Sequence, residues 1–179
     1  FLDQMRASPF QFAGLRASLH GSLAFTGVGH ATDRATILGL AGFTPEDYDA
    51  EAAEKVLEEI KQTRRISVEG LPELRFDPEH DMIFDYDTKL AGHANGMMLM
   101  ATDAQGDVAL RETYYSIGGG FVMTEKELAA GKDTDEGAPV PFPFKSAAEM
   151  LEMSAKSGKT IAGMKRANEE ARGGAENLR

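Results

Sequence analysis

Apolar and polar residues alternate along residues 14–25, which is the period of a β-strand with one buried face. The apolar positions are Leu15, Ala17, Leu19 and Leu23, and the polar positions are Arg16, Ser18, His20 and Ser22. We expect this strand to run from Leu15 to Phe25 and to end at Thr26-Gly27. Its apolar face predicts a layer of helices packed against it.

Residues 97–102 and 108–116 form two more strand-like runs, separated by a short loop that contains Gly106. A glycine-containing loop between two such runs predicts an antiparallel hairpin. Gly118 to Gly120 then interrupt the pattern and favour a bend. Short apolar pairs within residues 69–87 indicate brief strands joined by turns at prolines.

Helical periodicity predicts four helices, over residues 32–41, 50–64, 147–157 and 161–171. Asp49, Ser146 and Thr160 stand where N-cap residues are expected. Residues 1–9 are typical of the last turns of a further helix, so we expect the chain to be a piece of a longer protein. Residues 129–138 show no periodicity, and we expect them to be the most mobile part of the chain away from its ends.

Together these elements predict one α+β domain over residues 1–179, with a mixed or antiparallel sheet and helices packed on one face. The length suits a single domain, and a hydrophobic content of 42% is sufficient for its core. A parallel, doubly wound sheet is disfavoured because the hairpin signal is antiparallel.

Composition narrows the classes of partner and site. The chain has 19 Lys and Arg against 29 Asp and Glu, a formal net charge of −10, which argues against a nucleic-acid partner. Cysteine is absent, so the chain forms no disulfide, thiolate zinc site or catalytic thiol and ligates no iron–sulfur cluster through its own sulfur. No apolar run approaches the roughly 20 residues of a membrane span. We therefore expect no membrane segment and a cytoplasmic location.

The first candidate site lies in the glycine-rich stretch between the first strand and the first long helix. Gly27 and Gly29 are followed there by His30 and Thr32. Backbone N–H groups at the start of a helix can bind a carboxylate or a phosphate, and a titratable imidazole beside such an anion suits acid–base chemistry. The alternative is a tight turn in which Thr32 merely caps the helix.

Two later segments offer polar groups with similar ambiguity. His93 precedes Asn95-Gly96, which is either part of a site or an ordinary turn beside an exposed histidine. The glycines at 118–120 form either an anion-binding nest of amides or a simple bend. Neither His20 nor His80 has a convincing partner in the sequence, and the four histidines are dispersed, so we expect no metal bound by this chain.

Five segments are more informative as a set than one by one. They are Gly-Ser-Leu at 21–23, Thr-Gly-x-Gly-His-x-Thr-Asp at 26–33, His-x-Asn-Gly-Met at 93–97, Tyr-Tyr-Ser-Ile-Gly-Gly-Gly-Phe at 114–121 and Pro-Phe-Lys-Ser-Ala at 143–147. In this order they resemble the amino-terminal, or β, domain of the bacterial iron–sulfur L-serine dehydratases over nearly the whole chain. The family's upstream Gly-Pro-Ser-Ser-Ser-His-Thr motif and its cysteine-bearing α domain have no counterpart here.

The resemblance implies part of an L-serine ammonia-lyase, which converts L-serine to pyruvate and ammonia with a [4Fe-4S] cluster rather than pyridoxal phosphate. It implies that an α domain, fused or separate, holds the cluster, so this chain alone should bind no cluster and be inactive. It also implies a homodimer and a fold similar to the allosteric substrate-binding domain of phosphoglycerate dehydrogenases.

With the resemblance included, His30 is the candidate general base and His93 is the runner-up. The expected substrate contacts are Gly27, Gly29, Thr32, Asn95, Ser116, Gly118, Gly119 and Gly120. Two other functions remain open: a regulatory module that binds serine or another anion without chemistry, and a structural domain that only packs against its partner. His30 discriminates against the regulatory module, because such a site has no need of an imidazole at the ligand's Cα.

Overall fold

The computed structural model describes residues 1–130 and 140–173. The chain forms two compact units, Phe1–Lys132 and Asp133–Arg179. The expectation of a single domain over residues 1–179 stays a prediction. The expectation of high mobility at residues 129–138 falls, beyond Ala130, outside the described residues. No helix in the described ranges is both long and apolar enough to cross a membrane.

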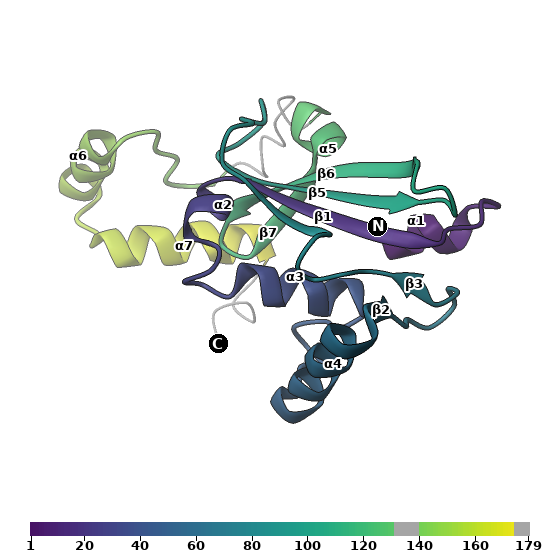
Figure 1. Ribbon diagram of the computed structural model, residues 1–179. Coiled ribbons are helices and arrows are strands. Elements are labelled where there is room, and N and C mark those ends of the chain that lie inside the picture. The colour runs from purple at the N-terminus through teal and green to yellow at the C-terminus, as the bar shows by residue number, and fades with distance from the viewer. Residues whose placement is uncertain (131–139, 174–179) are drawn as a thin grey trace. The chain divides into compact units, whose positions relative to one another are not determined.

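The larger unit is built on a mixed, seven-stranded sheet (Figure 1). Its strands are β1 (Gly14–Gly21), β2 (Arg65–Ile66), β3 (Leu74–Arg75), β4 (Met82–Asp85), β5 (Asn95–Thr102), β6 (Val108–Gly118) and β7 (Phe121–Thr124). The strand order is β2-β3-β1-β5-β6-β7, and β4 also pairs with β1. The pairs β1–β3 and β1–β4 are parallel, whereas β1–β5, β5–β6 and β6–β7 are antiparallel. The α+β class, the mixed sheet and the predicted hairpin are therefore confirmed.

Five helices accompany the sheet within this unit. They are α1 (Leu2–Ala7), α2 (Ser22–Thr26), α3 (Thr32–Leu40), α4 (Ala50–Thr63) and α5 (Glu125–Ala130). The predicted helices at 32–41 and 50–64 correspond to α3 and α4, and the Asp49 carboxylate caps α4 by accepting the N–H of Ala52 at 2.7 Å.

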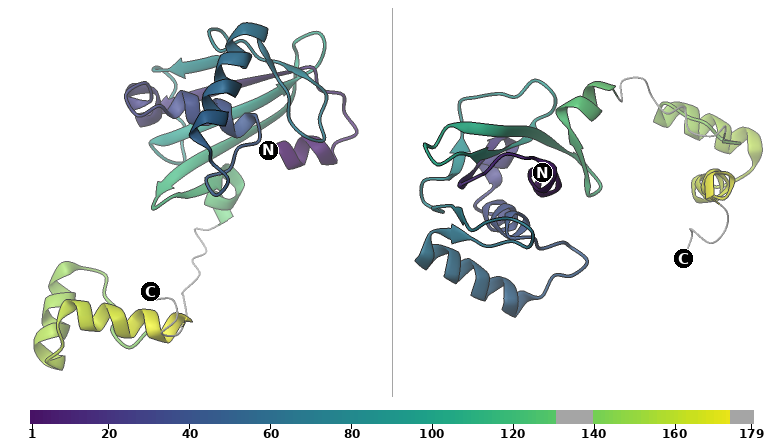
Figure 2. Two further views of the ribbon diagram at one scale, coloured as in Figure 1. Left: turned by 90° about the horizontal axis from the view of Figure 1, so that it is seen from below. Right: turned by 90° about the vertical axis from the view of Figure 1, so that its right-hand side faces the viewer.

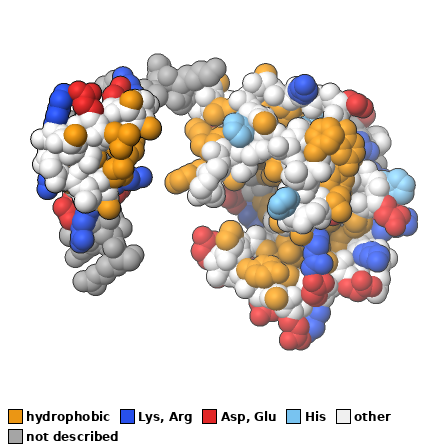
Figure 3. Space-filling model, turned by 90° about the vertical axis from the view of Figure 1, so that its left-hand side faces the viewer, with side chains coloured by type: hydrophobic (Ala, Val, Ile, Leu, Met, Phe, Trp, Pro, Cys, Tyr) orange, Lys and Arg blue, Asp and Glu red, His pale blue; other side chains and the backbone are white. Residues whose placement is uncertain are grey.

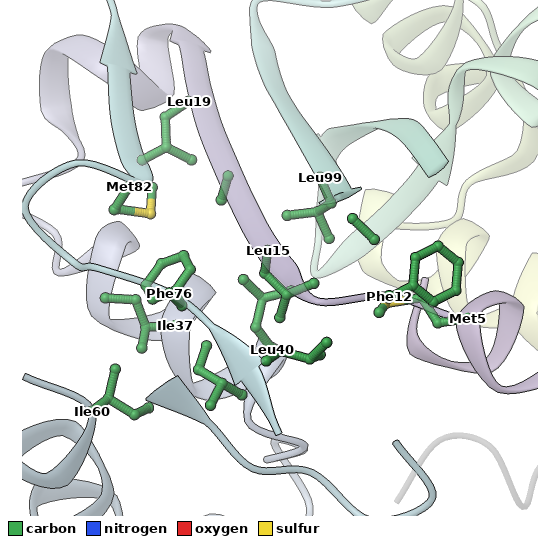
Figure 4. Packing of buried hydrophobic residues seen from close by; sticks show 14 of the residues in the cluster. Met5, Phe12, Leu15, Leu19, Ile37, Leu40, Ile60, Phe76, Met82 and Leu99 are labelled. Carbon is green, nitrogen blue, oxygen red and sulfur yellow. The ribbon is translucent and has the colours of Figure 1, made fainter. Parts of the chain in front are cut away.

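The core lies between one face of the sheet and the helices that cover it (Figure 4). Leu15, Ala17 and Leu19 of β1 are each at most 1% exposed and pack in one cluster with Ile37 and Leu40 of α3. These are the apolar positions of the alternating pattern, so the strand buries the face that the sequence predicts.

One helix departs from the expected arrangement. Tyr114 packs against the core cluster, so its neighbour Tyr115 points to the opposite face of the sheet. The Tyr115 hydroxyl lies 3.4 Å from the Glu125 carboxylate of α5. Figure 2 accordingly shows α5 on the side of the sheet opposite α3 and α4, so the helices do not all pack on one face.

The predicted end of the first strand is wrong. Strand β1 ends at Gly21, and residues 22–26 form the short helix α2. Gly21 adopts a φ of 55°, and a side chain there would overlap the carbonyl oxygen of Ala94. That same oxygen accepts the N–H of Ser22 at 2.8 Å, which turns the chain out of the sheet.

The smaller unit contains two helices, α6 (Ala147–Ser157) and α7 (Ile161–Gly173), as predicted. The Ser146 hydroxyl accepts the N–H of Glu149 at 3.2 Å, and the Thr160 hydroxyl accepts that of Gly163 at 3.1 Å. Asn168 of α7 is only 8% exposed, and its amide binds the backbone of Phe142. It accepts the N–H of Phe142 at 2.9 Å and donates to the carbonyl of Phe142 at 2.7 Å.

Candidate functional site

The segments that carry the predicted site residues converge on one end of the sheet. In the β1–β5 ladder Gly21 pairs with Asn95, and in the β5–β6 ladder Gly96 pairs with Tyr115, so Asn95 lies beside Ser116. The turn that carries His30 follows α2, which itself begins at the end of β1. Figure 3 looks onto this end of the larger unit and shows a hollow with exposed hydrophobic side chains around it.

A cavity of about 770 Å³ opens on the core side of this end of the sheet. Its walls include α1, α3 and strands β5 to β7, and Thr32 and Ser116 both line it. Its polar lining also includes Tyr114, whose pKa is raised by burial and by the nearby carboxylates of Glu112 and Glu127. The Tyr114 hydroxyl therefore stays protonated at neutral pH and is available as a hydrogen-bond donor.

His30 lies at a neighbouring hollow of about 510 Å³, together with Arg34 and Tyr48. The two hollows share wall residues from α3 and the segment after it, namely Ala35, Gly39, Phe43 and Thr44. The structure thus brings Thr32 and Ser116 to one cavity and places His30 in the adjoining one.

The hydrogen bonds of His30 determine which of its nitrogens can act as a base. Its Nδ1 lies 3.0 Å from the carbonyl oxygen of Thr26. A carbonyl oxygen can only accept, so Nδ1 carries the proton and donates it to Thr26. In the neutral imidazole Nε2 is then unprotonated, and because His30 is exposed this nitrogen can accept a proton from a ligand.

His93 has the opposite arrangement. Its Nδ1 accepts the backbone N–H of Asn95 at 3.1 Å, so the neutral ring carries its proton on Nε2. The side-chain amide of Asn95 donates to the carbonyl of Ser116 at 3.3 Å and joins β5 to β6. His93 therefore presents a hydrogen-bond donor, whereas His30 presents an acceptor.

The two glycines before His30 differ in their surroundings. Gly27 is buried, and a Cβ there would lie 2.9 Å from the Phe84 ring. Gly29 is exposed, and the nearest atom to a Cβ there would be 3.6 Å away. The carbonyl of Gly27 accepts the N–H of Thr32 at 2.9 Å, so this amide at the start of α3 is already paired. Gly27 thus has a packing reason for being glycine, in addition to its predicted role in substrate binding.

Gly118 ends β6, and Gly119 and Gly120 form the turn to β7; the φ values of the three glycines are 96°, 62° and 82°. Nothing lies within 4 Å of a Cβ built on Gly118 or Gly120, so the positive φ angles, rather than crowding, require glycine at these two positions. The expected bend is confirmed, and its exposed amides remain a predicted contact for an anion.

Two histidines have partners that the sequence did not reveal. His20 is only 3% exposed, and its Nε2 lies 2.8 Å from the Ser18 hydroxyl. His80 lies 3.0 Å from the Asp77 carboxylate. The expectation that neither has a partner is wrong; alternation along β1 places Ser18 and His20 on one face and could have indicated the first pair.

The Asp77–His80 pair belongs to a small exposed cluster. The ligand atoms of Asp77, Glu79 and His80 lie within 4.8 Å of one another. Arg64 lies 3.4 Å from the Asp77 carboxylate, and the pKa of Asp77 is lowered. Burial opposes this shift, but hydrogen bonds from Glu79 and His80 and the charge of Arg64 outweigh it. These contacts account for the cluster as an ion-pair network.

Comparison with known proteins places these residues in context. Residues 1–127 match the family model described as serine dehydratase beta chain. The chain is 40% identical to an L-serine dehydratase of Streptomyces coelicolor over 159 residues, 89% of this chain and 35% of the relative. It is 39% identical to one of Helicobacter pylori over 161 residues, 90% of this chain and 35% of the relative. One of Haemophilus influenzae is 36% identical over 176 residues, 97% of this chain and 38% of the relative. The chain thus spans about a third of the length of the curated relatives it matches.

Proposed function

The chain belongs to the serine dehydratase beta chain family, and we propose that it forms the beta part of an enzyme that converts L-serine to pyruvate and ammonia. The relatives that support this proposal are themselves L-serine dehydratases, and this chain corresponds to 35% to 38% of their length. We propose that a companion alpha part, fused or separate, supplies the remainder of the active site, and that this chain alone is inactive.

The residues of this chain do not fit the iron–sulfur cluster that we propose for the complete enzyme. Such clusters are held mainly by cysteine thiolates, and the 179 residues contain no cysteine. The cluster ligands must therefore come from the companion part, and no step proposed for this chain runs through the cluster. We propose that the complete enzyme uses this cluster rather than pyridoxal phosphate.

We propose that His30 is the general base. Conversion of L-serine requires removal of the Cα proton and loss of the β-hydroxyl as water. The resulting enamine tautomerises to an imine, and hydrolysis of the imine gives pyruvate and ammonia. Histidine is the side chain that most often serves as a general base, and the Thr26 carbonyl leaves Nε2 of His30 free to accept the proton.

The remaining predicted residues are proposed to bind the substrate. Backbone amides of the 118–120 turn would contact its carboxylate. Gly27 and Gly29 would leave room for it, since the amides of His30 and Thr32 are already paired within their own turn. Thr32 and Ser116, which share a cavity, and Asn95, which is hydrogen-bonded to Ser116, would contact its polar groups. His93 would act as a donor through Nε2 rather than as a second base.

The observation that carries the proposal is the meeting of four separate sequence segments at one end of the sheet. A purely structural domain has no need of exposed histidines and paired polar groups at the same edge. Further proposals, which extend the family membership, are homodimerisation, a cytoplasmic location and a fold similar to the allosteric substrate-binding domain of phosphoglycerate dehydrogenases.

The proposal is tested by assaying pyruvate release from L-serine with the enzyme reconstituted from this chain and its companion part. We expect turnover by the complete enzyme, a preference for L-serine over L-threonine, and none by this chain alone. A complete enzyme that leaves L-serine unchanged would refute the proposal. Calorimetry of this chain with L-serine tests the regulatory alternative, which requires binding at millimolar concentration or tighter.

A further inference from the structure

Residues 86–94 connect β4 to β5 without forming helix or strand, and we refer to them as the 86–94 segment (Figure 1). The segment carries His93 and leads directly into Asn95 at the site end of the sheet. Irregular segments are held in place only by specific contacts, so the position of His93 depends on what anchors this stretch of chain.

A row of three residues crosses the sheet beneath this segment. His20 of β1 pairs with Gly96 of β5, and Gly96 pairs with Tyr115 of β6. All three lie on the face opposite the main core. His20 is 3% exposed and Tyr115 is fully buried. Helix α5 covers part of this face beside Tyr115, and the 86–94 segment lies over the rest of the row.

The glycine in the middle of the row makes room for the segment. A Cβ on Gly96 would lie 2.6 Å from Cδ1 of Leu90 and 3.4 Å from the Tyr115 ring. Leu90 therefore occupies the space above Gly96 that a larger residue would fill. The dipeptide Asn95-Gly96 begins β5, so the ordinary turn that the sequence left open there is not formed.

The two rings that flank Gly96 each bind the backbone of the segment. Nδ1 of His20 donates to the carbonyl of Thr88 at 3.2 Å, and the Ser18 hydroxyl holds the other ring nitrogen at 2.8 Å. The hydroxyl of Tyr115 accepts the N–H of Gly92 at 3.3 Å. The backbone of Gly92 lies against the Tyr115 ring, because a Cβ there would be 2.5 Å from two of its ring atoms.

Two further contacts orient the ends of the segment. The Asp85 carboxylate accepts the N–H groups of Asp87 at 3.0 Å and Thr88 at 2.8 Å, and it lies 3.7 Å from Nδ1 of His20. At the other end, the carbonyl of Ala94 accepts the N–H of Ser22 at 2.8 Å. The segment is thus fixed at both ends and at two internal points, and these contacts restrict the position of His93.

We propose that His20 and Tyr115 are positioning residues, which hold the 86–94 segment across Gly96 so that His93 and Asn95 stand at the site end of the sheet. The consequence for activity rests on the proposed function, whereas the anchoring itself does not. Neither residue touches the candidate site directly, and both act through the segment.

Amide hydrogen exchange of the full chain tests the anchoring. Tyr115→Phe removes the hydroxyl that accepts from Gly92 and also its contact with Glu125 of α5, whereas Gly92→Ala keeps that hydroxyl and pushes the segment off the Tyr115 ring. We expect exchange within residues 86–94 to rise about tenfold, the scale of one lost hydrogen bond, in each variant. Tyr114→Phe, the matched control on the opposite face, should leave it unchanged. Unchanged exchange in both test variants, or an equal rise in α4, would overturn the proposal.

Kinetics of the complete enzyme test the consequence. Tyr115→Phe should lower kcat/KM several-fold in the otherwise unchanged enzyme but less than twofold when His93→Ala is already present, because the two changes act through one group. A full effect of Tyr115→Phe in the His93→Ala background would overturn positioning through His93. If the proposed function is wrong, the complete enzyme does not turn over L-serine, but the exchange result is unaffected. The two failures are therefore distinguishable.

Discussion

Adding one methyl group at Gly27 is expected to destabilise the larger unit. The backbone of Gly27 is right-handed, with φ −58° and ψ −44°, so alanine there carries no backbone strain. A Cβ would, however, overlap the carbonyl oxygen of Leu23 and lie 2.9 Å from the Phe84 ring and 3.3 Å from Leu19. Overpacking of this kind lowers the free energy of unfolding by about 1–3 kcal/mol. Alanine also reduces the entropy of the unfolded chain, which raises the free energy of unfolding by about 0.4–1 kcal/mol. We therefore expect a net loss of about 1–2 kcal/mol in the free energy of unfolding.

Urea unfolding followed by circular dichroism measures this change, provided that the slope of the transition is the same in both proteins. The matched control is Gly29→Ala, two residues away and exposed, where the nearest atom to the new Cβ is 3.6 Å distant. It should raise the free energy of unfolding slightly, by at most about 1 kcal/mol, because the smaller entropy of unfolded alanine acts there without a clash. Equal stability of the two variants would refute the packing role of Gly27 and favour the alternative that its small size serves only to admit substrate.

Two further predictions concern Asp85 and Asn168. The N–H and hydroxyl of Thr88 lower the pKa of Asp85, so its stabilisation of the folded chain is complete above the unfolded pKa of about 3.9 and is lost as the pH falls through the lower folded pKa. The Thr88 amide resonance should therefore shift only below about pH 4 and should lose this titration in Asp85→Asn; a midpoint above 4 would contradict the assignment. In the smaller unit, Asn168→Ala leaves the N–H of Phe142 without its acceptor, and amide exchange in α7 should rise by a factor corresponding to about 1–3 kcal/mol. Exchange at the wild-type rate would show that the clamp is dispensable.

Local signals predict most of the regular structure. The hairpin of β5 and β6 follows from two apolar runs around a short glycine-containing loop, and α4 and α6 begin where Asp49 and Ser146 can cap them. In each case the residues that determine the element are neighbours in sequence. These elements therefore require no knowledge of distant contacts.

The features that sequence did not predict depend on residues far apart in the chain. Strand β1 ends at Gly21 because the carbonyl of Ala94 leaves no room for a side chain and captures the next amide. The alternating pattern continues past that point, so it gives no warning of the turn. Two partners of His20, Asp85 of β4 and Thr88 of the 86–94 segment, are likewise distant in the chain, whereas Ser18 lies only two residues away in β1.

The candidate site shows the same division. Its residues were predicted from motifs, and His30 was preferred to His93 as the general base. The sequence does not indicate which ring nitrogen carries the proton in either histidine. The backbone groups of Thr26 and Asn95 supply that information, since one can only accept and the other can only donate. The distribution of His30 and Thr32 between two adjoining hollows also depends on packing around α3 and could not be foreseen.

The most direct test of the central claim is the kcat of His30→Ala in the complete enzyme, with His80→Ala as the control for loss of an exposed histidine away from the site. Loss of a general base typically costs a factor of about 100 to 10,000, so we predict a fall of at least about a hundredfold for His30→Ala. His80→Ala should retain the wild-type kcat. Near-wild-type kcat in His30→Ala, together with loss of activity in His93→Ala, would contradict the assignment of the base to His30.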